Sequence, residues 1–349
     1  MPYYPKLREI TPKKERARII ENILALKKSI SAQVPRKTLE RNLIVATWNL
    51  REFGKNNKAD RLIETHFYIA EIISAFDLIA VQEIGENLDE LKLLISLLGP
   101  EWDYIITDIT EGASGNKERL AFIFDNRKVQ FRNMAGEIVL PEKPKAKKPN
   151  KQIARTPFIV AFQSKWFKFY VTTVHIYYGN ASKTSAEYKR RVQEIGNVAE
   201  FLNKRAEKEK SNHLILGDFN ITGAGIDDPT MNALLKHRFE IPETVQMLVN
   251  LNTNALRTMP YDQIAFRDQT GYMEFISNSN SAGILDYYET VFKDNDESIY
   301  KPHFSKTKLK SFKEWKTYQM SDHLPLWVEF NVDFSEKYLY KLQNFEYEK

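Results

Sequence analysis

Eight short apolar runs between residues 42 and 330 constrain the fold of this chain more than any other feature. Each is six to nine residues long and rich in β-branched or aromatic residues, which is typical of β-strands. The runs are NLIVATWNL (42–50), FDLIAVQEI (76–84), LAFIFD (120–125), PFIVAF (157–162), KFYVTTVHI (168–176), NHLILGDFN (212–220), YDQIAFRD (261–268) and LPLWVEF (324–330). A chain with so many separate strands is expected to fold around β-sheets.

Three stretches between these runs have the apolar period of an amphipathic helix, at residues 60–76, 87–98 and 184–209. The last of them opens with Thr184 and Glu187, which have the spacing of a capping box. Strands mixed with amphipathic helices predict an α/β or α+β fold in which helices cover the sheet faces.

The chain is expected to have a short extension at each end. Residues 1–40 are predicted to be an N-terminal helical extension, with Thr11 and Pro12 at the start of the helix. A narrow apolar stripe follows at Ile20, Ile23, Leu24 and Ile30. We expect the main domain over residues 41–335 and a C-terminal tail over residues 336–349.

Composition excludes several classes of protein. The 349 residues include no cysteine, so neither a disulfide nor a cysteine metal site can form. The N-terminus lacks the apolar core of a signal peptide, and no later stretch is long enough to cross a bilayer. We therefore expect a soluble, cytoplasmic protein with no membrane partner, although secretion without disulfides stays open. The net charge of +5 is compatible with an anionic partner but does not by itself indicate one.

Polar side chains stand at the ends of the predicted strands. If the strand ends meet at one rim of the sheets, these carboxylates, amides and imidazoles converge there. Such a group supplies oxygen ligands for a hard metal ion together with general acid–base catalysts. Its members are Asn49, Glu83, Glu118, His175, Asp218, Asn220, Asp262, Asp322 and His323.

Eight motifs in this order resemble the endonuclease/exonuclease/phosphatase superfamily, and within it the pancreatic-type deoxyribonucleases. They are WNLREFG (48–54), VQEI (81–84), KERLAFIF (117–124), ARTPFIVAF (154–162), TVHIYYG (173–179), LGDFN (216–220), YDQI (261–264) and SDHLPL (321–326). The resemblance extends from about residue 42 to residue 331. It implies a four-layer αββα sandwich of two packed mixed sheets, with the active site at one edge of the pair.

The resemblance also implies a divalent metal cofactor, Mg²⁺, for which Mn²⁺ can substitute. Asn49 and Glu83 correspond to the residues that hold the metal, and Asp322 to a further metal-side carboxylate. These side chains offer oxygen donors, which Mg²⁺ prefers.

The remaining roles that the resemblance implies concern the histidines and the phosphate. His175 corresponds to a catalytic histidine oriented by Glu118, and His323 to a second one paired with Asp262. A carboxylate beside an imidazole supports the imidazolium form, which can donate to a phosphate oxygen.

Three residues are expected to lie at the scissile phosphate. Asp218 and Asn220 correspond to the pair that contacts the phosphate, the attacking water or a second metal, and Arg155 to an arginine near the phosphate. On a strand, positions 218 and 220 would point to the same side, and we expect both to face one phosphate.

The chain departs from the deoxyribonuclease pattern at its DNA contacts. Gly85 and Asn116 stand where those enzymes have an arginine and a tyrosine for the minor groove. Two basic segments are added instead, at 141–151 and 300–319. The second places Lys306, Lys308, Lys310 and Lys313 among Phe304, Phe312 and Trp315. This mixture suits a nucleic-acid backbone and unstacked bases, although an amphipathic helix that covers the core explains it equally well.

These features predict a metal-dependent endonuclease that hydrolyses DNA by histidine-assisted attack of water on the phosphate. The alternative is a phosphoesterase of the same chemistry that acts on a small-molecule or lipid substrate. A non-catalytic scaffold is disfavoured, because every catalytic position carries a side chain able to do its chemistry.

Overall fold

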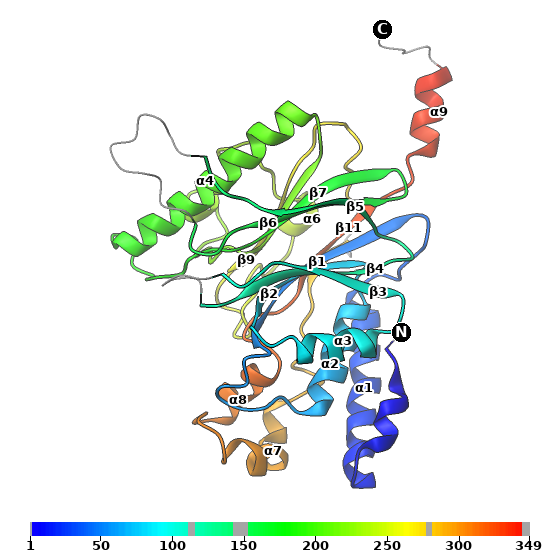
Figure 1. Ribbon diagram of the computed structural model, residues 1–349, viewed down its shortest axis with the longest axis vertical. Helices are drawn as coiled ribbons and strands as arrows, with labels where there is room; N and C mark the ends of the chain where they lie inside the picture. The colour runs from blue at the N-terminus through cyan, green and yellow to red at the C-terminus, as the bar shows by residue number, and fades with distance from the viewer. Residues whose placement is uncertain (1, 111–115, 142–152, 277–280, 344–349) are drawn as a thin grey trace.

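The computed structural model describes residues 2–110, 116–141, 153–276 and 281–343. Within these ranges, two mixed β-sheets pack face to face, and helices cover the outer side of each (Figure 1). The four-layer αββα sandwich predicted from the sequence is therefore confirmed. The basic stretch 142–151 lies outside the described residues.

In the described chain the first sheet has six strands in the order β10-β11-β1-β2-β4-β3, and the second has five in the order β5-β6-β7-β8-β9. All eight predicted strands are present: β1 (Asn42–Phe53), β2 (Leu78–Ile84), β4 (Arg119–Asp125), β6 (Phe158–Ser164), β7 (Phe167–His175), β8 (His213–Asp218), β9 (Asp262–Arg267) and β11 (Leu326–Asn331). Three strands were not predicted: β3 (Trp102–Ile106), β5 (Gln130–Glu137) and β10 (Ala282–Ile284).

Helices line both outer faces (Figure 1). The first sheet is covered by α1 (Lys13–Gln33), α2 (Ile63–Ser74) and α3 (Asp89–Leu98), and the second by α4 (Ala186–Glu209) and α5 (Pro229–Leu235). The shorter elements are η1 (Tyr4–Glu9), α6 (Glu243–Gln246), η2 (Asp294–Asp296), α7 (Glu297–Phe304), α8 (Phe312–Gln319) and α9 (Ser335–Gln343). Across the described residues, none of the helices has both the length and the apolar character that spanning a bilayer requires.

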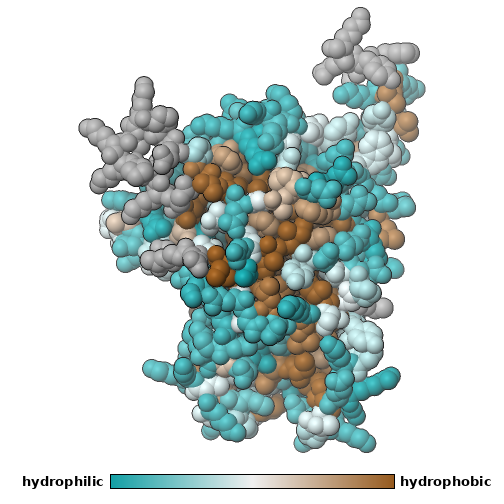
Figure 2. Space-filling view, in the orientation of Figure 1, coloured by the Kyte–Doolittle hydropathy of each residue, from teal (hydrophilic) through white to brown (hydrophobic). Residues whose placement is uncertain are grey.

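Strand alternation divides the core into two hydrophobic clusters. In β1, Leu43 and Val45 face the second sheet, while Ile44 and Ala46 face the helices. Both faces of this central strand are therefore buried, which explains the unbroken apolar stretch at residues 43–46. Figure 2 shows hydrophobic side chains running down the middle of one face of the molecule, with hydrophilic ones around them.

The N-terminal helix differs in detail from its prediction. It begins at Lys13, and its buried residues are Ile19, Ile23, Leu26 and Ile30. Ile20 and Leu24 of the predicted stripe are exposed. The helix packs on α2 and adds its buried face to the cluster beneath the first sheet.

The start of α4 also differs from its prediction. Ser185, one residue after the predicted cap Thr184, accepts a hydrogen bond from the backbone N–H of Tyr188. The Thr184 hydroxyl lies 3.1 Å from that of Ser182 instead. The predicted cap is therefore one position too early, and the capping box predicted at Thr184 and Glu187 is wrong, because Tyr188 occupies the third helical position.

The insertion before β11 forms helices in which Phe312 and Trp315 are buried and Phe304 is partly buried. Phe312 and Trp315 join the hydrophobic cluster below the first sheet, and Trp315 is only 1% exposed. Their proposed use as stacking surfaces for bases is therefore wrong, because these rings have no free face. The four lysines predicted to contact nucleic acid are exposed: Lys306, Lys308, Lys310 and Lys313.

Candidate active site

Strand directions bring the predicted polar residues to one edge of the sandwich. β1 and β2 are parallel, and so are β7 and β8, so each pair ends together. β4, β9 and β11 run antiparallel to these neighbours and begin at the same edge. This topology places the polar strand ends at one edge, as predicted from the sequence.

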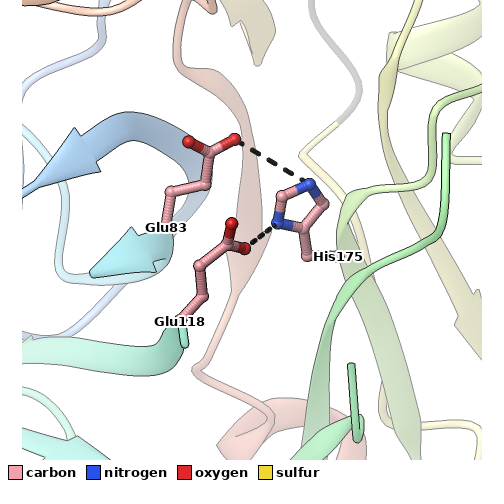
Figure 3. Close-up of side chains that lie close together, drawn as sticks. All are labelled: Glu83, Glu118 and His175. Atoms are coloured by element: carbon pink, nitrogen blue, oxygen red, sulfur yellow. Dashed lines mark ion pairs between the residues drawn. The ribbon is translucent and has the colours of Figure 1, made fainter. Parts of the chain in front are cut away.

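His175, the last residue of β7, faces two carboxylates (Figure 3). Its Nδ1 lies 2.9 Å from Glu118 Oε2, and its Nε2 lies 3.9 Å from Glu83 Oε1. Glu118 is also 2.7 Å from Arg155 Nε and 3.6 Å from Lys55 Nζ. Burial by itself would raise the pKa of Glu118, but His175, Arg155 and Lys55 together hold that pKa at about 2. Glu118 is therefore ionised at neutral pH.

His323 forms the second carboxylate–imidazole pair. Its Nδ1 lies 2.7 Å from Asp262 Oδ2, which also accepts a hydrogen bond of 2.6 Å from the hydroxyl of Thr253. Burial by itself lowers the pKa of His323, but the charges of Asp262 and Asp218 outweigh it and raise that pKa well above its ordinary value. The charged imidazolium form of the ring is therefore favoured.

Asp218 joins the two histidines. Its Oδ2 lies 3.5 Å from His175 Nε2 and 3.8 Å from His323 Nε2, and it accepts a hydrogen bond of 3.1 Å from Asn49 Nδ2. The Nε2 atoms of both imidazoles thus face Asp218. The Nδ1 atom of His175 faces Glu118, and that of His323 faces Asp262.

Asn220 does not lie as predicted. β8 ends at Asp218, and Asn220 has the left-handed φ of 53°, so the strand alternation expected for positions 218 and 220 does not apply. The amide Nδ2 of Asn220 donates to the carbonyl of Ile176 at 2.8 Å, and its backbone N–H donates to Asp218 Oδ1 at 2.9 Å. In this arrangement Asn220 holds Asp218 in place.

Glu83 is oriented by the end of β1. Its Oε1 accepts from Asn49 Nδ2 at 2.8 Å, and its Oε2 accepts from the backbone N–H of Glu52 at 2.9 Å. The Oδ1 of Asn49 accepts from the backbone N–H of Arg51 at 2.9 Å. Asn49 therefore turns its amide nitrogen, and not its oxygen, toward the carboxylates.

Two groups of side chains bring possible metal-ligating atoms within 4.8 Å of one another in the described chain. One is Glu83, Glu118 and His175, and the other is Asp218, Asp262 and His323. Carboxylate oxygens at the edge of a cavity match the donor chemistry of Mg²⁺ or Mn²⁺. The predicted ligand Asp322 belongs to neither group: it is half exposed, and its Oδ2 lies 3.7 Å from Arg51 Nε.

A cavity of about 740 Å³ opens beside these residues, with Glu83, Glu118, Asp322 and His323 in its wall. Its cationic lining was not predicted, and it consists of Arg51, Lys55, Lys58 and Lys117. Arg51, Lys55 and Lys58 follow Asn49 in the stretch WNLREFGKNNK. Their closeness in sequence to this strand-end residue could have indicated that they lie near the site. Asn116 also lines this cavity.

Arg155 is buried behind Glu118, and it is not among the residues that line the described part of the cavity. Its Nε bonds Glu118 at 2.7 Å, so the residue supports the carboxylate partner of His175. Within the described chain its Nη1 has no hydrogen-bond partner. The predicted contact of Arg155 with a phosphate stays a prediction.

Comparisons with known proteins identify the family and the fold of this chain. The family described as "Endonuclease/Exonuclease/phosphatase family" matches residues 46–287. No curated protein matches the sequence.

Several solved structures share the fold. The catalytic domain of human Nocturnin has a TM-score of 0.51 and 14% identity, over 83% of this chain and 94% of that one. A family protein from Bacteroides thetaiotaomicron has a TM-score of 0.51 and 18% identity, over 85% and 97%. D. rerio TDP2 complexed with a single-strand DNA product has a TM-score of 0.51 and 14% identity, over 83% and 99%. At these identities the likeness shows a common fold.

Proposed function

Since this chain belongs to the endonuclease/exonuclease/phosphatase family, we propose that it is a divalent-metal-dependent endonuclease that hydrolyses DNA. One observation carries the proposal: Asp218 lies between His175 and His323, and each histidine has its own buried carboxylate partner. Phosphate ester hydrolysis needs groups that accept a proton from water and donate to phosphate oxygens, and this arrangement supplies both.

The chain's own residues divide the work as follows. His323, an imidazolium backed by Asp262, donates from Nε2 to an oxygen of the phosphate and stabilises the charge that develops there. Asp218 orients the attacking water and accepts its proton. His175, held by Glu118, places a second Nε2 on the other side of Asp218, toward the same phosphate.

Glu83 is the residue we propose as the main metal ligand, because its carboxylate lies at the cavity wall and is held from both oxygens. Mg²⁺ or Mn²⁺ there would neutralise charge on the phosphate and make a bound water more acidic. The hydrogen bonds from Asn49 and Glu52 would fix the direction of the carboxylate toward the ion.

Cationic residues in and near the cavity support a polyanionic substrate. Lys55, Lys58 and Lys117 line the cavity, and the exposed lysines of the insertion extend the positive charge beyond it. Gly85 and Asn116 provide no long side chain for the minor groove, so we propose that contacts to the DNA backbone replace such a wedge.

A small phosphate ester is the second candidate substrate. The observation in its favour is the size of the cavity, since about 740 Å³ is enough to hold a small ligand and its lining carries both charges.

The test uses supercoiled plasmid, with bis-p-nitrophenyl phosphate and p-nitrophenyl phosphate as small substrates. We expect nicking of the plasmid and hydrolysis of the diester in Mg²⁺ or Mn²⁺, and neither in EDTA. Glu83→Ala should abolish both activities, whereas Glu243→Ala, at an exposed position on α6, should change neither.

The outcomes separate the two candidates. Hydrolysis of the small esters without any nicking would favour the second candidate. Nicking that persists at full rate in EDTA would overturn the proposed metal dependence.

A further inference from the structure

Arg61 lies between β1 and α2, outside every motif described above, and its side chain is fully buried. Its Nη2 donates to the carbonyls of Leu50 at 3.2 Å and Arg51 at 2.6 Å, and its Nη1 donates to the carbonyl of Glu52 at 3.3 Å. One guanidinium thus satisfies three consecutive carbonyls. Its Nε donates to a fourth, that of Gln319, at 3.1 Å.

The three carbonyls belong to an irregular part of β1. The pairing of β1 with β2 shifts register between Asn49 and Phe53. Arg51 and Glu52 have left-handed φ values of 33° and 52°, which non-glycine residues rarely adopt. Such a backbone persists only where its surroundings hold it, and here the donors to three of its carbonyls come from the Arg61 side chain.

The backbone N–H groups of the same residues orient the proposed metal site. The N–H of Arg51 donates to Asn49 Oδ1, and the N–H of Glu52 donates to Glu83 Oε2, each at 2.9 Å. The peptide groups held by Arg61 on one side therefore hold the side chains of Asn49 and Glu83 on the other.

The fourth carbonyl connects Arg61 to the second half of the site. Gln319 ends α8, four positions before His323. Between them, Ser321 donates from Oγ to the carbonyl of Asn49 at 2.5 Å and accepts from the backbone N–H of His323 at 2.9 Å. The segment that carries His323 is thus fastened to the end of β1 at two places, by Ser321 and by Arg61.

We propose that Arg61 is a positioning residue for the reaction: it holds the backbone that orients Glu83 and Asn49 and fixes the segment leading to His323, without contact to the substrate. The inference rests on the proposed function. Its side chain suits the task because a planar guanidinium has five donors in a fixed fork, whereas a lysine has one ammonium group.

The charge and packing of Arg61 fit this role. Nη1 lies 3.3 Å from Glu90 Oε2, so the buried cation has an anionic partner. The guanidinium carbon lies 5.1 Å from the ring centre of Phe53 and 5.2 Å from that of Tyr318. These contacts leave the guanidinium little freedom to turn.

The test compares Arg61→Ala and Arg61→Lys with Arg18→Ala as the matched control. Arg18 also makes an ion pair with a buried glutamate, Glu64, but it does so on α1, away from the end of β1. For each variant we would measure turnover of bis-p-nitrophenyl phosphate at saturating Mn²⁺, the affinity of the substrate-free protein for Mn²⁺ by electron paramagnetic resonance, and the melting temperature.

Arg61→Ala should lower kcat and weaken Mn²⁺ binding by about tenfold or more each, the scale for removing a group that orients a metal ligand. Guanidinium chloride at low millimolar concentration should restore part of both losses, because it can occupy the vacated site. Arg61→Lys should melt closer to the unaltered protein but recover little activity. Arg18→Ala should lower the melting temperature without changing kcat or Mn²⁺ affinity, and guanidinium should not affect it.

A folded Arg61→Ala with unchanged kcat and Mn²⁺ affinity would overturn the inference, as would equal losses in Arg18→Ala. If Arg61→Ala does not fold, Arg61→Lys decides, and full activity in that variant overturns the inference. If the unaltered protein hydrolyses no substrate, the proposed function fails, while the Mn²⁺ affinities still report on the positioning of Glu83.

Discussion

The two histidine pairs of the site have the same chemical parts in different electrostatic settings. Glu118, the partner of His175, lies within 4 Å of two other cationic groups, Arg155 and Lys55. Asp262, the partner of His323, is fully buried, and besides the imidazole its Oδ2 meets the neutral hydroxyl of Thr253. Among the described residues, Glu118 therefore makes ion pairs with three side chains, whereas Asp262 makes one, with His323.

This difference shows that a carboxylate beside a histidine can have either of two effects: it can raise the pKa of the ring, or it can join several cationic side chains. Asp262 raises the pKa of His323 and so acts mainly on the chemistry of the ring. Glu118 has its own pKa held at about 2 by the cations around it, so it ties together His175, Arg155 and Lys55. We therefore expect the His323 pair to be more sensitive in activity and the His175 pair to be more sensitive in stability.

The largest expected effect comes from removing the imidazoles. His323→Ala and His175→Ala should each slow hydrolysis of bis-p-nitrophenyl phosphate by about two or more orders of magnitude, the scale for losing acid–base or charge stabilisation. The loss should be greater for His323, because Asp262 and Asp218 raise the pKa of its ring and so favour the imidazolium that stabilises charge on the phosphate. Steady-state kcat at saturating metal measures both.

The matched control is His213→Ala, which removes another buried histidine, one that lies at the far end of β8 from Asp218. It should leave kcat unchanged in the folded protein. A greater loss for His175→Ala than for His323→Ala would break the comparison.

The next effect concerns the coupling within one pair. Asp262→Asn and His323→Ala should be strongly non-additive, because the carboxylate acts through the imidazole and has nothing to support once the ring is gone. The double variant should be about as slow as the slower single variant. Rates that multiply as two independent losses would show that the two residues do not work together.

A smaller effect separates the pairs by their pH dependence. The pKa of Glu118 is lowered from an ordinary 4.5 to about 2, so its stabilisation is complete above about pH 4.5 and is lost as pH falls toward 2. The pKa of His323 is raised above 6.5, so its stabilisation is complete below that pH and is lost as pH rises through the higher value.

Glu118→Gln should therefore flatten the loss of stability in acid, and Asp262→Asn should flatten the loss at alkaline pH. At neutral pH Glu118→Gln should also cost about 3 kcal/mol, the scale for leaving a buried charge such as Arg155 unpaired. Urea unfolding midpoints across the pH range measure both changes. Interchanged pH windows would contradict the electrostatic difference between the pairs.

The smallest effect on the chemistry is expected from the insertion. Changing Lys306, Lys308, Lys310 and Lys313 together to Ala should weaken DNA binding and flatten its salt dependence, by roughly one unit of log–log slope for each phosphate that a lysine no longer neutralises. Turnover of bis-p-nitrophenyl phosphate should be nearly unchanged, because neither histidine pair is altered. Binding isotherms at several salt concentrations test this.

The control replaces four exposed lysines of β7 and α4, outside the insertion, namely Lys168, Lys189, Lys204 and Lys208. It should leave both the affinity and the salt slope in place. If the salt dependence of DNA binding is unchanged in the insertion variant, those lysines are only solvent-exposed and take no part in binding.

The central strands could be predicted from sequence because they are buried on both faces, and burial leaves a continuous apolar run. The missed strands lie at the edges. β5 is mostly exposed, so its residues, QFRNMAGE, carry no apolar alternation, and β10 has only three residues. An edge strand is specified by its neighbour's backbone more than by its own side chains.

The polar strand ends were predictable for a related reason, because a charged residue that closes an apolar run needs a partner. Which partner it takes was not predictable. Arg155 could be matched to a phosphate contact, but its burial beside Glu118 depends on the packing of two sheets. Trp315 could be read as a stacking surface until the fold placed it inside the core.

The place of β1 in the first sheet also has a consequence for how the protein is made. β1 pairs on one side with β2, which follows it closely in the chain, and on the other with β11, so that Asn42 lies opposite Asn331. During synthesis, one edge of this apolar strand has no partner until almost the whole described chain has left the ribosome. Pairing between such distant segments is slow, and an open apolar edge attracts strands of other molecules. Yield in the cell should therefore depend on chaperones that shield nascent β1 until β11 emerges.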